Sequence, residues 1–302
     1  MRQEQPSESI AEGRPFWNAR SITQFYPFLR GTRRVSQLLG ALRSNTDRWA
    51  VTPNNEHLPT LALNLGIEFH RRLYLFPRAY KRLYMQSELI GLIGRELDRG
   101  GVFLDIGCNV GIYSLIAAQR LRGIGQVYSF EPDPVSFESL QRSAHANQLN
   151  NIQPVNVALS NEDSRAVLYR DAPGSTANSL IGHKDPRARR SLDNVSVRAI
   201  KLDDHYMEIG FEPSALRLVK VDVEGAEVQA VSGALGVLKA ARPPIWCEVR
   251  GPAGSTRAPN TFAAVSQLLA SLGYQALRRQ GGIERAASDV LGREDILFRF
   301  GG

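Results

Sequence analysis

A buried strand that leads straight into a glycine turn constrains this chain more than any other feature. Residues 102–106 (VFLDI) are apolar except for Asp105, and Gly107 and Gly111 follow before a segment of helical character. A strand, a tight turn and a helix in this order allow backbone N–H groups to approach a nucleotide-like ligand closely. Ordinary strand–turn–helix units share the pattern, so the turn alone does not define a ligand.

The spacing of the turn separates two classes of ligand. It reads D-x-G-x-x-x-G, whereas the dinucleotide fingerprint reads G-x-G-x-x-G and requires glycine at the position of Asn109. The spacing therefore argues against an NAD-dependent dehydrogenase. It is the variant seen in enzymes that bind S-adenosylmethionine (SAM).

Strand-like apolar runs alternate with segments of helical periodicity along most of the chain. We expect strands at residues 102–106, 126–130, 152–159, 165–169, 195–200, 216–222, 244–249, 274–279 and 295–300. We expect helices at residues 81–97, 111–121, 134–147, 225–239 and 261–272. This alternation favours an α/β domain with a mostly parallel sheet and helices on both faces. It predicts such a domain over residues 80–302, after a basic and aromatic extension over residues 1–79.

Basic residues are concentrated in the N-terminal third. Residues 1–99 contain 15 Lys and Arg against nine Asp and Glu, and the whole chain has a formal net charge of +7. A basic face can bind an anionic substrate, a membrane surface or RNA. A solvated surface is the simpler interpretation, because no run of five like charges occurs. Aromatic residues interleaved with arginine over residues 16–79 favour a cover on the main domain, and such a cover is a candidate substrate cap.

Two features bear on the compartment. Cys108 and Cys247 are far apart in sequence and indicate neither a disulfide framework nor a metal cage. Residues 1–15 are polar and lack the apolar core of a signal peptide, and no apolar run is long enough to cross a bilayer. We therefore expect a cytoplasmic protein with no transmembrane segment.

Polar residues at the first three strand ends are the candidate ligand-binding groups, because open parallel sheets bind ligands at the carboxyl ends of their strands. Asp105 ends the first strand, and Gly107 leaves room for a ligand against the main chain. Glu131 ends the second strand, where a carboxylate can accept hydrogen bonds from both ribose hydroxyls. Ser160 ends the third and can frame the adenine. A surface position for Glu131 and an ordinary turn at Ser160 are the alternatives.

Carboxylates also cluster at two later strands. Asp222 and Glu224 follow the strand 216–222, and Glu248 lies in the strand 244–249. Charges at a buried strand end are costly unless they are paired, cap a helix or take part in chemistry. Together these groups can share a proton, bind a divalent ion or hold a substrate hydroxyl. His183, in a polar loop, is a further candidate base, although a loop histidine more often faces solvent.

Taken together, these blocks resemble the FkbM family of SAM-dependent methyltransferases. The resemblance rests on residues 102–118, YSFEPDP, NVALSN, the LDD at 202–204, LVKVDVEGAEVQAVSGA, the CEV strand and the terminal EDILF, over roughly residues 80–302. It implies a class I, Rossmann-like methyltransferase fold with a seven-stranded, mostly parallel sheet whose last strand is antiparallel. It also implies acceptor-side roles for Asp222 and Glu224. The SAM contacts that it implies come from Asp105, Gly107, Asn109, Gly111 and Glu131.

The reaction expected from this resemblance is in-line transfer of the sulfonium methyl to a hydroxyl of a sugar, glycolipid or polyketide-type acceptor. Positive charge on sulfur is lost during transfer, so the enzyme mainly has to align the two substrates in a dry pocket. Asp222, with Glu224 as second choice, would accept the hydroxyl proton. A metal-assisted version would place Asp222 and Glu248 on Mg²⁺. The need for a divalent metal and the oligomeric state stay open.

Two further classes of protein compete with this interpretation. An RNA methyltransferase would use the basic N-terminal third, but base N-methylation commonly shows [DN]-P-P-[FYW] after the fourth strand, where this chain has DVEG. Nucleic acid is therefore a less favoured partner than a small molecule or glycan. A non-catalytic SAM-fold protein would keep the donor site and transfer nothing.

Overall fold

The computed structural model describes residues 49–52, 59–65, 67–75, 86–170, 180, 193–251 and 260–301. The chain divides into two units, residues 1–85 and 86–302. The second unit thus begins a few residues after the boundary placed at residue 80 from the sequence, and it contains all the residues proposed for the site.

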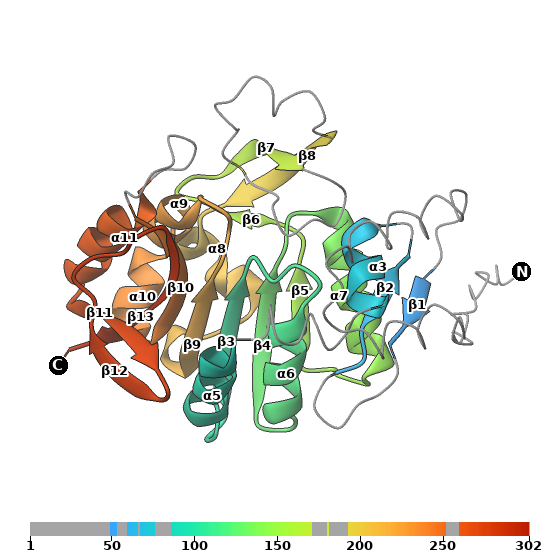
Figure 1. Ribbon diagram of the computed structural model, residues 1–302, viewed down its shortest axis with the longest axis horizontal. Coiled ribbons are helices and arrows are strands. Elements are labelled where there is room, and N and C mark those ends of the chain that lie inside the picture. Colours follow the sequence, from blue (N-terminus) through green and yellow to red (C-terminus); the bar gives the residue numbers. More distant parts are fainter. Residues whose placement is uncertain are drawn as a thin grey trace, which may run out of the picture. The chain divides into compact units, whose positions relative to one another are not determined.

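Apolar strands in the second unit form an eight-stranded sheet (Figure 1). The strands are β3 (Gly101–Ile106), β4 (Gly125–Phe130), β5 (Ile152–Val155), β9 (Leu216–Val221), β10 (Ile245–Arg250), β11 (Tyr274–Gln280), β12 (Ile283–Ala286) and β13 (Arg293–Phe300). Their order is β12-β11-β13-β10-β9-β3-β4-β5. The five strands from β5 to β10 in this order are parallel, whereas β13 runs antiparallel to both β10 and β11.

The sheet has one strand more than the seven expected, because β12 folds back on β11 as a hairpin. Gly281 and Gly282 form its turn with positive φ angles of 58° and 81°. Their N–H groups donate hydrogen bonds to Glu88 of α5 (Ser87–Glu96), over 2.6 and 3.2 Å. The last strand of the chain, β13, is antiparallel as expected.

Two expected elements are each divided in the structure. The run 152–159 gives β5 and β6 (Ala158–Leu159), and β6 belongs to a separate three-stranded sheet with β8 (Asp193–Ile200) and β7 (Ser164–Arg170). The expected helix 225–239 is two helices, α9 (Glu227–Ser232) and α10 (Leu235–Ala241). Gly233 lies between them, where an added Cβ would be 1.8 Å from the carbonyl oxygen of Ser160.

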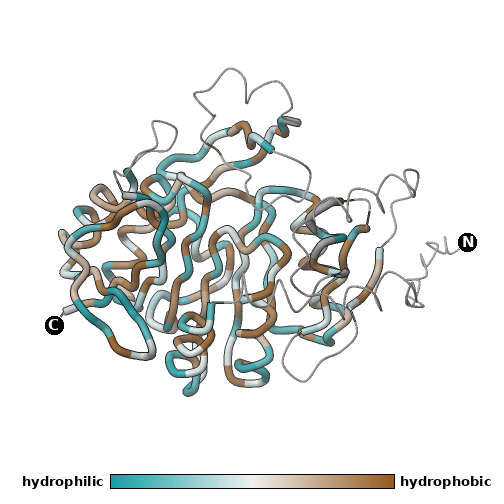
Figure 2. The backbone as a smooth tube through the Cα atoms, in the orientation of Figure 1, coloured by the Kyte–Doolittle hydropathy of each residue, from teal (hydrophilic) through white to brown (hydrophobic). Residues whose placement is uncertain are grey.

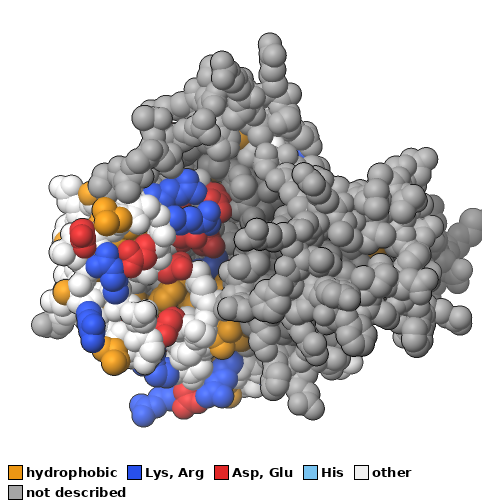
Figure 3. Space-filling view, viewed as in Figure 1, with side chains coloured by type: hydrophobic (Ala, Val, Ile, Leu, Met, Phe, Trp, Pro, Cys, Tyr) orange, Lys and Arg blue, Asp and Glu red, His pale blue; other side chains and the backbone are white. Residues whose placement is uncertain are grey.

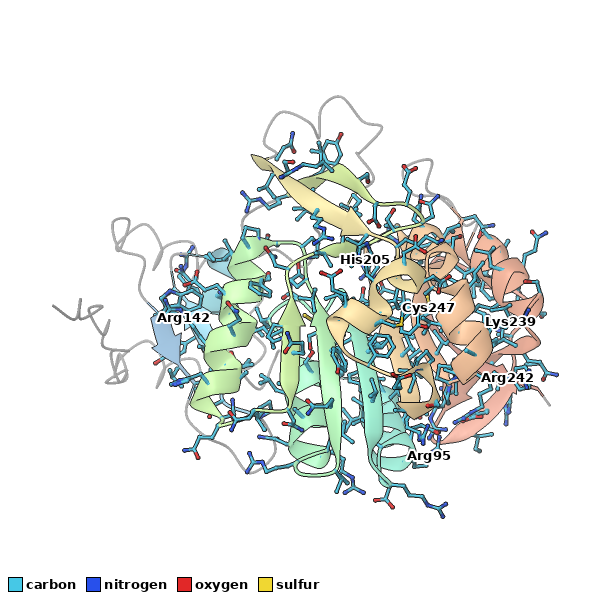
Figure 4. All side chains as sticks on the ribbon, turned by 180° about the vertical axis from the view of Figure 1, so that it is seen from behind. Arg95, Arg142, His205, Lys239, Arg242 and Cys247 are labelled. Atoms are coloured by element: carbon cyan, nitrogen blue, oxygen red, sulfur yellow. The ribbon has the colours of Figure 1, made fainter. Side chains whose placement is uncertain are left out.

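Helices cover both faces of the larger sheet. The remaining helices among the described residues of this unit are α6 (Ile112–Arg120), α7 (Pro134–Ala146), α8 (Leu202–Ile209), the short 3-10 helix η2 (Pro213–Ala215) and α11 (Thr261–Ala270). Figure 1 shows α5 and α6 in front of the sheet, and α8 and α10 are seen from behind in Figure 4. Hydrophobic stretches follow the central strands in Figure 2. Alternation along β3 sends Leu104 and Ile106 into the main hydrophobic core, whereas Asp105 contacts α6.

The described part of the first unit is small. Strand β1 (Trp49–Val51) pairs antiparallel with β2 (Ala62–Asn64), and α3 (Glu68–Leu75) follows. Most of the aromatic and arginine-rich segment expected to act as a cap lies outside the described residues. In the parts of the chain that the structure describes, no helix combines the length and the apolar character needed to span a bilayer.

Candidate active site

The order of the strands brings most of the predicted site residues to one edge of the sheet. Strand β3 lies between β4, which follows it in the chain, and β9, which comes much later. The direction of winding therefore reverses between β3 and β9, and ligands of open α/β sheets bind at such a switch point, beyond the carboxyl ends of the strands. Asp105 and Asp222 lie at the ends of these two strands.

Asp105 lies beneath this edge and is fully buried. Its Oδ2 accepts a hydrogen bond from Ser114 Oγ (2.7 Å), and that hydroxyl accepts one from Ser129 Oγ (2.8 Å). Its Oδ1 lies 3.3 Å from Nζ of Lys220, its neighbour in register on β9. Asp105 therefore organises the end of β3 from inside the protein, and its carboxylate is not open to a ligand in this structure.

Lys220 joins the two strands at the switch point, and the sequence analysis missed it. Besides its contact with Asp105, its Nζ donates to the carbonyl oxygen of Gly107 (3.2 Å) and lies 3.5 Å from Asp222 Oδ2. The two carboxylates outweigh the effect of burial and raise the pKa of Lys220, so it is an ammonium ion. The available signal was a lysine inside the otherwise apolar run LVKV, two positions before Asp222.

The two glycines of the turn are required by packing. Gly107 and Gly111 have φ angles of 75° and 82°, which favour glycine. An added Cβ at Gly107 would lie 1.9 Å from the carbonyl oxygen of Asp222, and one at Gly111 would lie 2.3 Å from Cδ1 of Leu140. Backbone of the segment after β9 thus fills the position that a Cβ of Gly107 would take, and room for a ligand on the other side of Gly107 stays a prediction.

Glu131, in the loop after β4, connects this loop with the glycine turn after β3 through a hydrogen bond. Its Oε2 accepts a hydrogen bond from the N–H of Asn109 (2.8 Å), and its Oε1 accepts one from the N–H of Asp133 (2.9 Å). Burial raises the pKa of Glu131 from 4.5 to about 8, although both backbone donors act in the opposite direction. Asn156, which the sequence analysis also missed, donates to the carbonyl oxygen of Glu131 (2.8 Å). Asn109 and Glu131 are thus brought together.

Ser160 lies apart from this loop in its described contacts. It follows β6, its N–H donates to the carbonyl oxygen of Ile200 (2.8 Å), and its Oγ donates to Oδ1 of Asn161 (3.3 Å). No hydrogen bond among the described residues connects Ser160 with Glu131 or Gly107.

Three carboxylates meet beyond β9 and β10. An oxygen atom of each of Asp222, Glu224 and Glu248 lies within 4.8 Å of the others. Basic and acidic side chains gather side by side on the face shown in Figure 3. Glu224 has a left-handed backbone with φ of 53°, which is uncommon for this residue type. The structure thus brings the predicted acceptor-side residues together.

Two arginines hold Glu224 in place. Arg293 donates to both of its oxygens, from Nη2 to Oε1 (2.7 Å) and from Nη1 to Oε2 (3.1 Å), and Arg250 donates to Oε2. Arg293 Nη2 also forms an ion pair with Glu248 Oε2 at 2.5 Å. Burial and the neighbouring Asp222 raise the pKa of Glu248. The Asp222 side chain is 32% exposed, against 12% for Glu224 and 11% for Glu248, so it is the most accessible carboxylate of the three.

A fourth carboxyl group, Asp295, lies opposite Glu248 in the β10–β13 register. Its Oδ2 accepts a hydrogen bond from Nε2 of Gln86 (2.6 Å), whose Oε1 accepts one from Nε1 of Trp246 (3.0 Å). Burial raises the pKa of Asp295 from 3.8 to about 6, and the charge of Asp222 adds to this shift. The sequence analysis used the EDILF block only as a family signature and did not assign Asp295.

One thiol and two imidazole groups also bear on the chemistry of the site. Cys247, labelled in Figure 4, is fully buried in β10, and burial raises the pKa of its thiol, so it does not offer an accessible thiolate. His183 lies outside the described residues. His205, also labelled, is instead paired with Asp163, with 2.5 Å between Nε2 and Oδ2.

The strand order, the antiparallel last strand and the glycine turn at the switch point define a Rossmann-like α/β fold of the class I methyltransferase type. A family model described as the methyltransferase FkbM domain matches residues 105–276, which is more than half of the chain. The chain belongs to this family of SAM-dependent methyltransferases.

Individual relatives are distant. The chain is 28% identical over 168 residues to the 31-O-demethyl-FK506 methyltransferase FkbM of Streptomyces tacrolimicus, covering 46% of this chain and 62% of that protein. It is 24% identical over 154 residues to the hexuronic acid methyltransferase AglP of Haloferax volcanii, covering 51% and 58%. The chain thus spans about three-fifths of the length of these curated relatives. A crystal structure of methyltransferase FkbM from Methylobacillus flagellatus aligns with 16% identity and a TM-score of 0.42, covering 76% of this chain and 54% of that chain.

Proposed function

We propose that this protein transfers the methyl group of SAM to a hydroxyl oxygen of a small-molecule acceptor, a sugar, glycolipid or polyketide. The observation that carries the proposal is an accessible carboxylate, Asp222, held by Lys220 directly beside the glycine turn. The names of two relatives, which describe methylation of 31-O-demethyl-FK506 and of a hexuronic acid, support this choice of acceptor.

The two loops after β3 and β4, which contain Asn109 and Glu131, form the proposed donor side. SAM supplies an electrophilic methyl group on a positively charged sulfur. Each oxygen of Glu131 accepts one backbone N–H and retains a second lone pair, which a ribose hydroxyl can use. Asp105, Gly107 and Gly111 contribute by shaping the turn from within, because their side chains or Cβ positions face other parts of the chain.

Asp222 is the proposed proton acceptor. An alcohol becomes a competent nucleophile as its proton is transferred to a base placed within hydrogen-bond reach. Lys220 Nζ lies 3.5 Å from Asp222 Oδ2 on the buried side, whereas the Asp222 side chain is 32% exposed and can be reached by an acceptor. Glu224, the second choice from the sequence, has both oxygens held by arginines. Its proposed role is therefore to anchor the loop after β9.

Two measurements test the proposal. Calorimetry with SAM and with its demethylated product should detect binding to the wild-type protein. Asp222→Asn should keep SAM affinity within about threefold, yet lower transfer to an accepted substrate by at least about 100-fold, the range of general-base catalysis. Equal loss of binding and transfer would contradict the role of Asp222. SAM binding without transfer to a broad panel of hydroxyl acceptors would favour the non-catalytic alternative.

A further inference from the structure

The cluster of Asp222, Glu224 and Glu248 has the composition of a divalent-cation site, but an arginine lies within it. The Nη2 atom of Arg293 is 2.7 Å from Glu224 Oε1, 2.5 Å from Glu248 Oε2 and 4.0 Å from Asp222 Oδ1. Hard divalent cations bind carboxylate oxygens at about 2.0–2.6 Å. An ion bound to these oxygens would therefore compete with Arg293 for the same acceptor atoms.

The sheet register shows that this arrangement is built into the fold. Arg293 and Arg250 lie directly opposite each other on β13 and β10. Like charges in this position repel, but Glu224 accepts hydrogen bonds from both guanidinium groups and offsets the repulsion. The left-handed backbone at Glu224 brings its carboxylate between them. The two neighbouring arginines therefore require Glu224 as their shared counter-charge.

We propose that Arg293 is the resident cation of this cluster, standing in the place of a divalent metal ion. Its guanidinium holds Glu224 and Glu248 and leaves Asp222 as the accessible carboxylate. Arg293 is thus a positioning residue, and methyl transfer through Asp222 needs no divalent ion; this last statement rests on the proposed function. Removing the guanidinium should leave three neighbouring carboxylates without their main counter-charge and create a site for a divalent cation.

Binding of Mn²⁺ to the purified protein, followed by electron paramagnetic resonance of the free ion, tests the proposal without any acceptor. We expect Arg293→Met to bind one Mn²⁺ at least about tenfold more tightly than the wild type, because three carboxylates become available as ligands. Arg293→Lys retains a cation and should resemble the wild type. Arg142→Met, at an i,i+4 pair on α7, is the matched control and should gain no site.

Several outcomes would overturn the proposal. One is a wild-type protein that binds Mn²⁺ as tightly as Arg293→Met and loses that ion in Glu248→Gln. Another is a folded Arg293→Met protein, with native circular dichroism, that gains no Mn²⁺ affinity. If Arg293→Met does not fold, the wild type and Glu248→Gln still decide the question, because tight binding that depends on Glu248 contradicts a resident arginine.

A separate measurement tests whether methyl transfer depends on a divalent ion. With an accepted substrate, the wild-type rate in EDTA should equal the rate with added Mg²⁺ within about twofold, and a tenfold loss in EDTA would contradict the proposal. Failure of the proposed function itself would be visible independently, as a lack of SAM binding by calorimetry. The Mn²⁺ measurements retain their meaning in either case.

Discussion

Replacing Lys220 by methionine should destabilise the protein strongly, because it leaves Asp105 as an uncompensated charge inside the sheet. Asp105 has no exposed surface, and its Oδ1 has Lys220 Nζ as its ion-pair partner at 3.3 Å. Removing one partner of a buried ion pair costs about 3–5 kcal/mol. Ser114 still donates to Oδ2 in the variant, so we expect the lower half of this range.

Thermal and urea unfolding measure this effect. For a unit of this size, each kcal/mol lowers Tm by roughly 2–4 °C, so Lys220→Met should lower it by about 6–16 °C. Lys239→Met removes an exposed lysine of α10 and should change the free energy of unfolding by less than about 0.5 kcal/mol. Lys220→Met combined with Asp105→Asn should recover more than half of the loss, because no unpaired buried charge remains.

Two results would refute this reasoning. The first is a free energy of unfolding of Lys220→Met within about 1 kcal/mol of that of the Lys239→Met control. This result would mean that other groups compensate the buried charge of Asp105. The double variant could also be no more stable than Lys220→Met alone. In that case the loss would arise from the side-chain volume or from the contact with Gly107, and not from Asp105.

Three further predictions follow from single contacts. Gly107→Ala should lower the free energy of unfolding by more than about 2 kcal/mol, measured in urea, because φ is 75° and the new Cβ would lie 1.9 Å from a backbone oxygen. Asp203→Ala should lower it by about 1 kcal/mol, because Asp203 accepts the N–H groups of Gly236 and Val237 at the start of α10; Asp203→Asn should recover part of the loss. Glu131→Gln should reduce the pH dependence of stability. A carboxyl group whose pKa is raised by folding binds its proton more tightly in the folded state, so wild-type stability should fall as the pH rises from 4.5 to about 8, and an unchanged slope in the variant would contradict the shift.

Much of the fold was accessible from local patterns. The run VFLDIG predicted β3 and its turn, and the boundaries of β4, β7 and β11 were predicted to within about one residue. The hairpin strand β12 was missed because its four residues, IERA, alternate weakly and are mostly exposed. The division of 152–159 was missed because the turn at Asn156 depends on a hydrogen bond to the carbonyl of Glu131, which is distant in the sequence.

The amino-acid sequence by itself determined which groups end the strands, because apolar runs and positive-φ glycines are properties of short segments. It therefore identified Asp105, Gly107, Glu131 and Asp222. Only the tertiary structure decided what these groups contact: the Asp105–Lys220 pair and the arginines around Glu224 form across neighbouring strands. Such pairs depend on strand order and register, which arise from the packing of the whole sheet and cannot be obtained from any one segment.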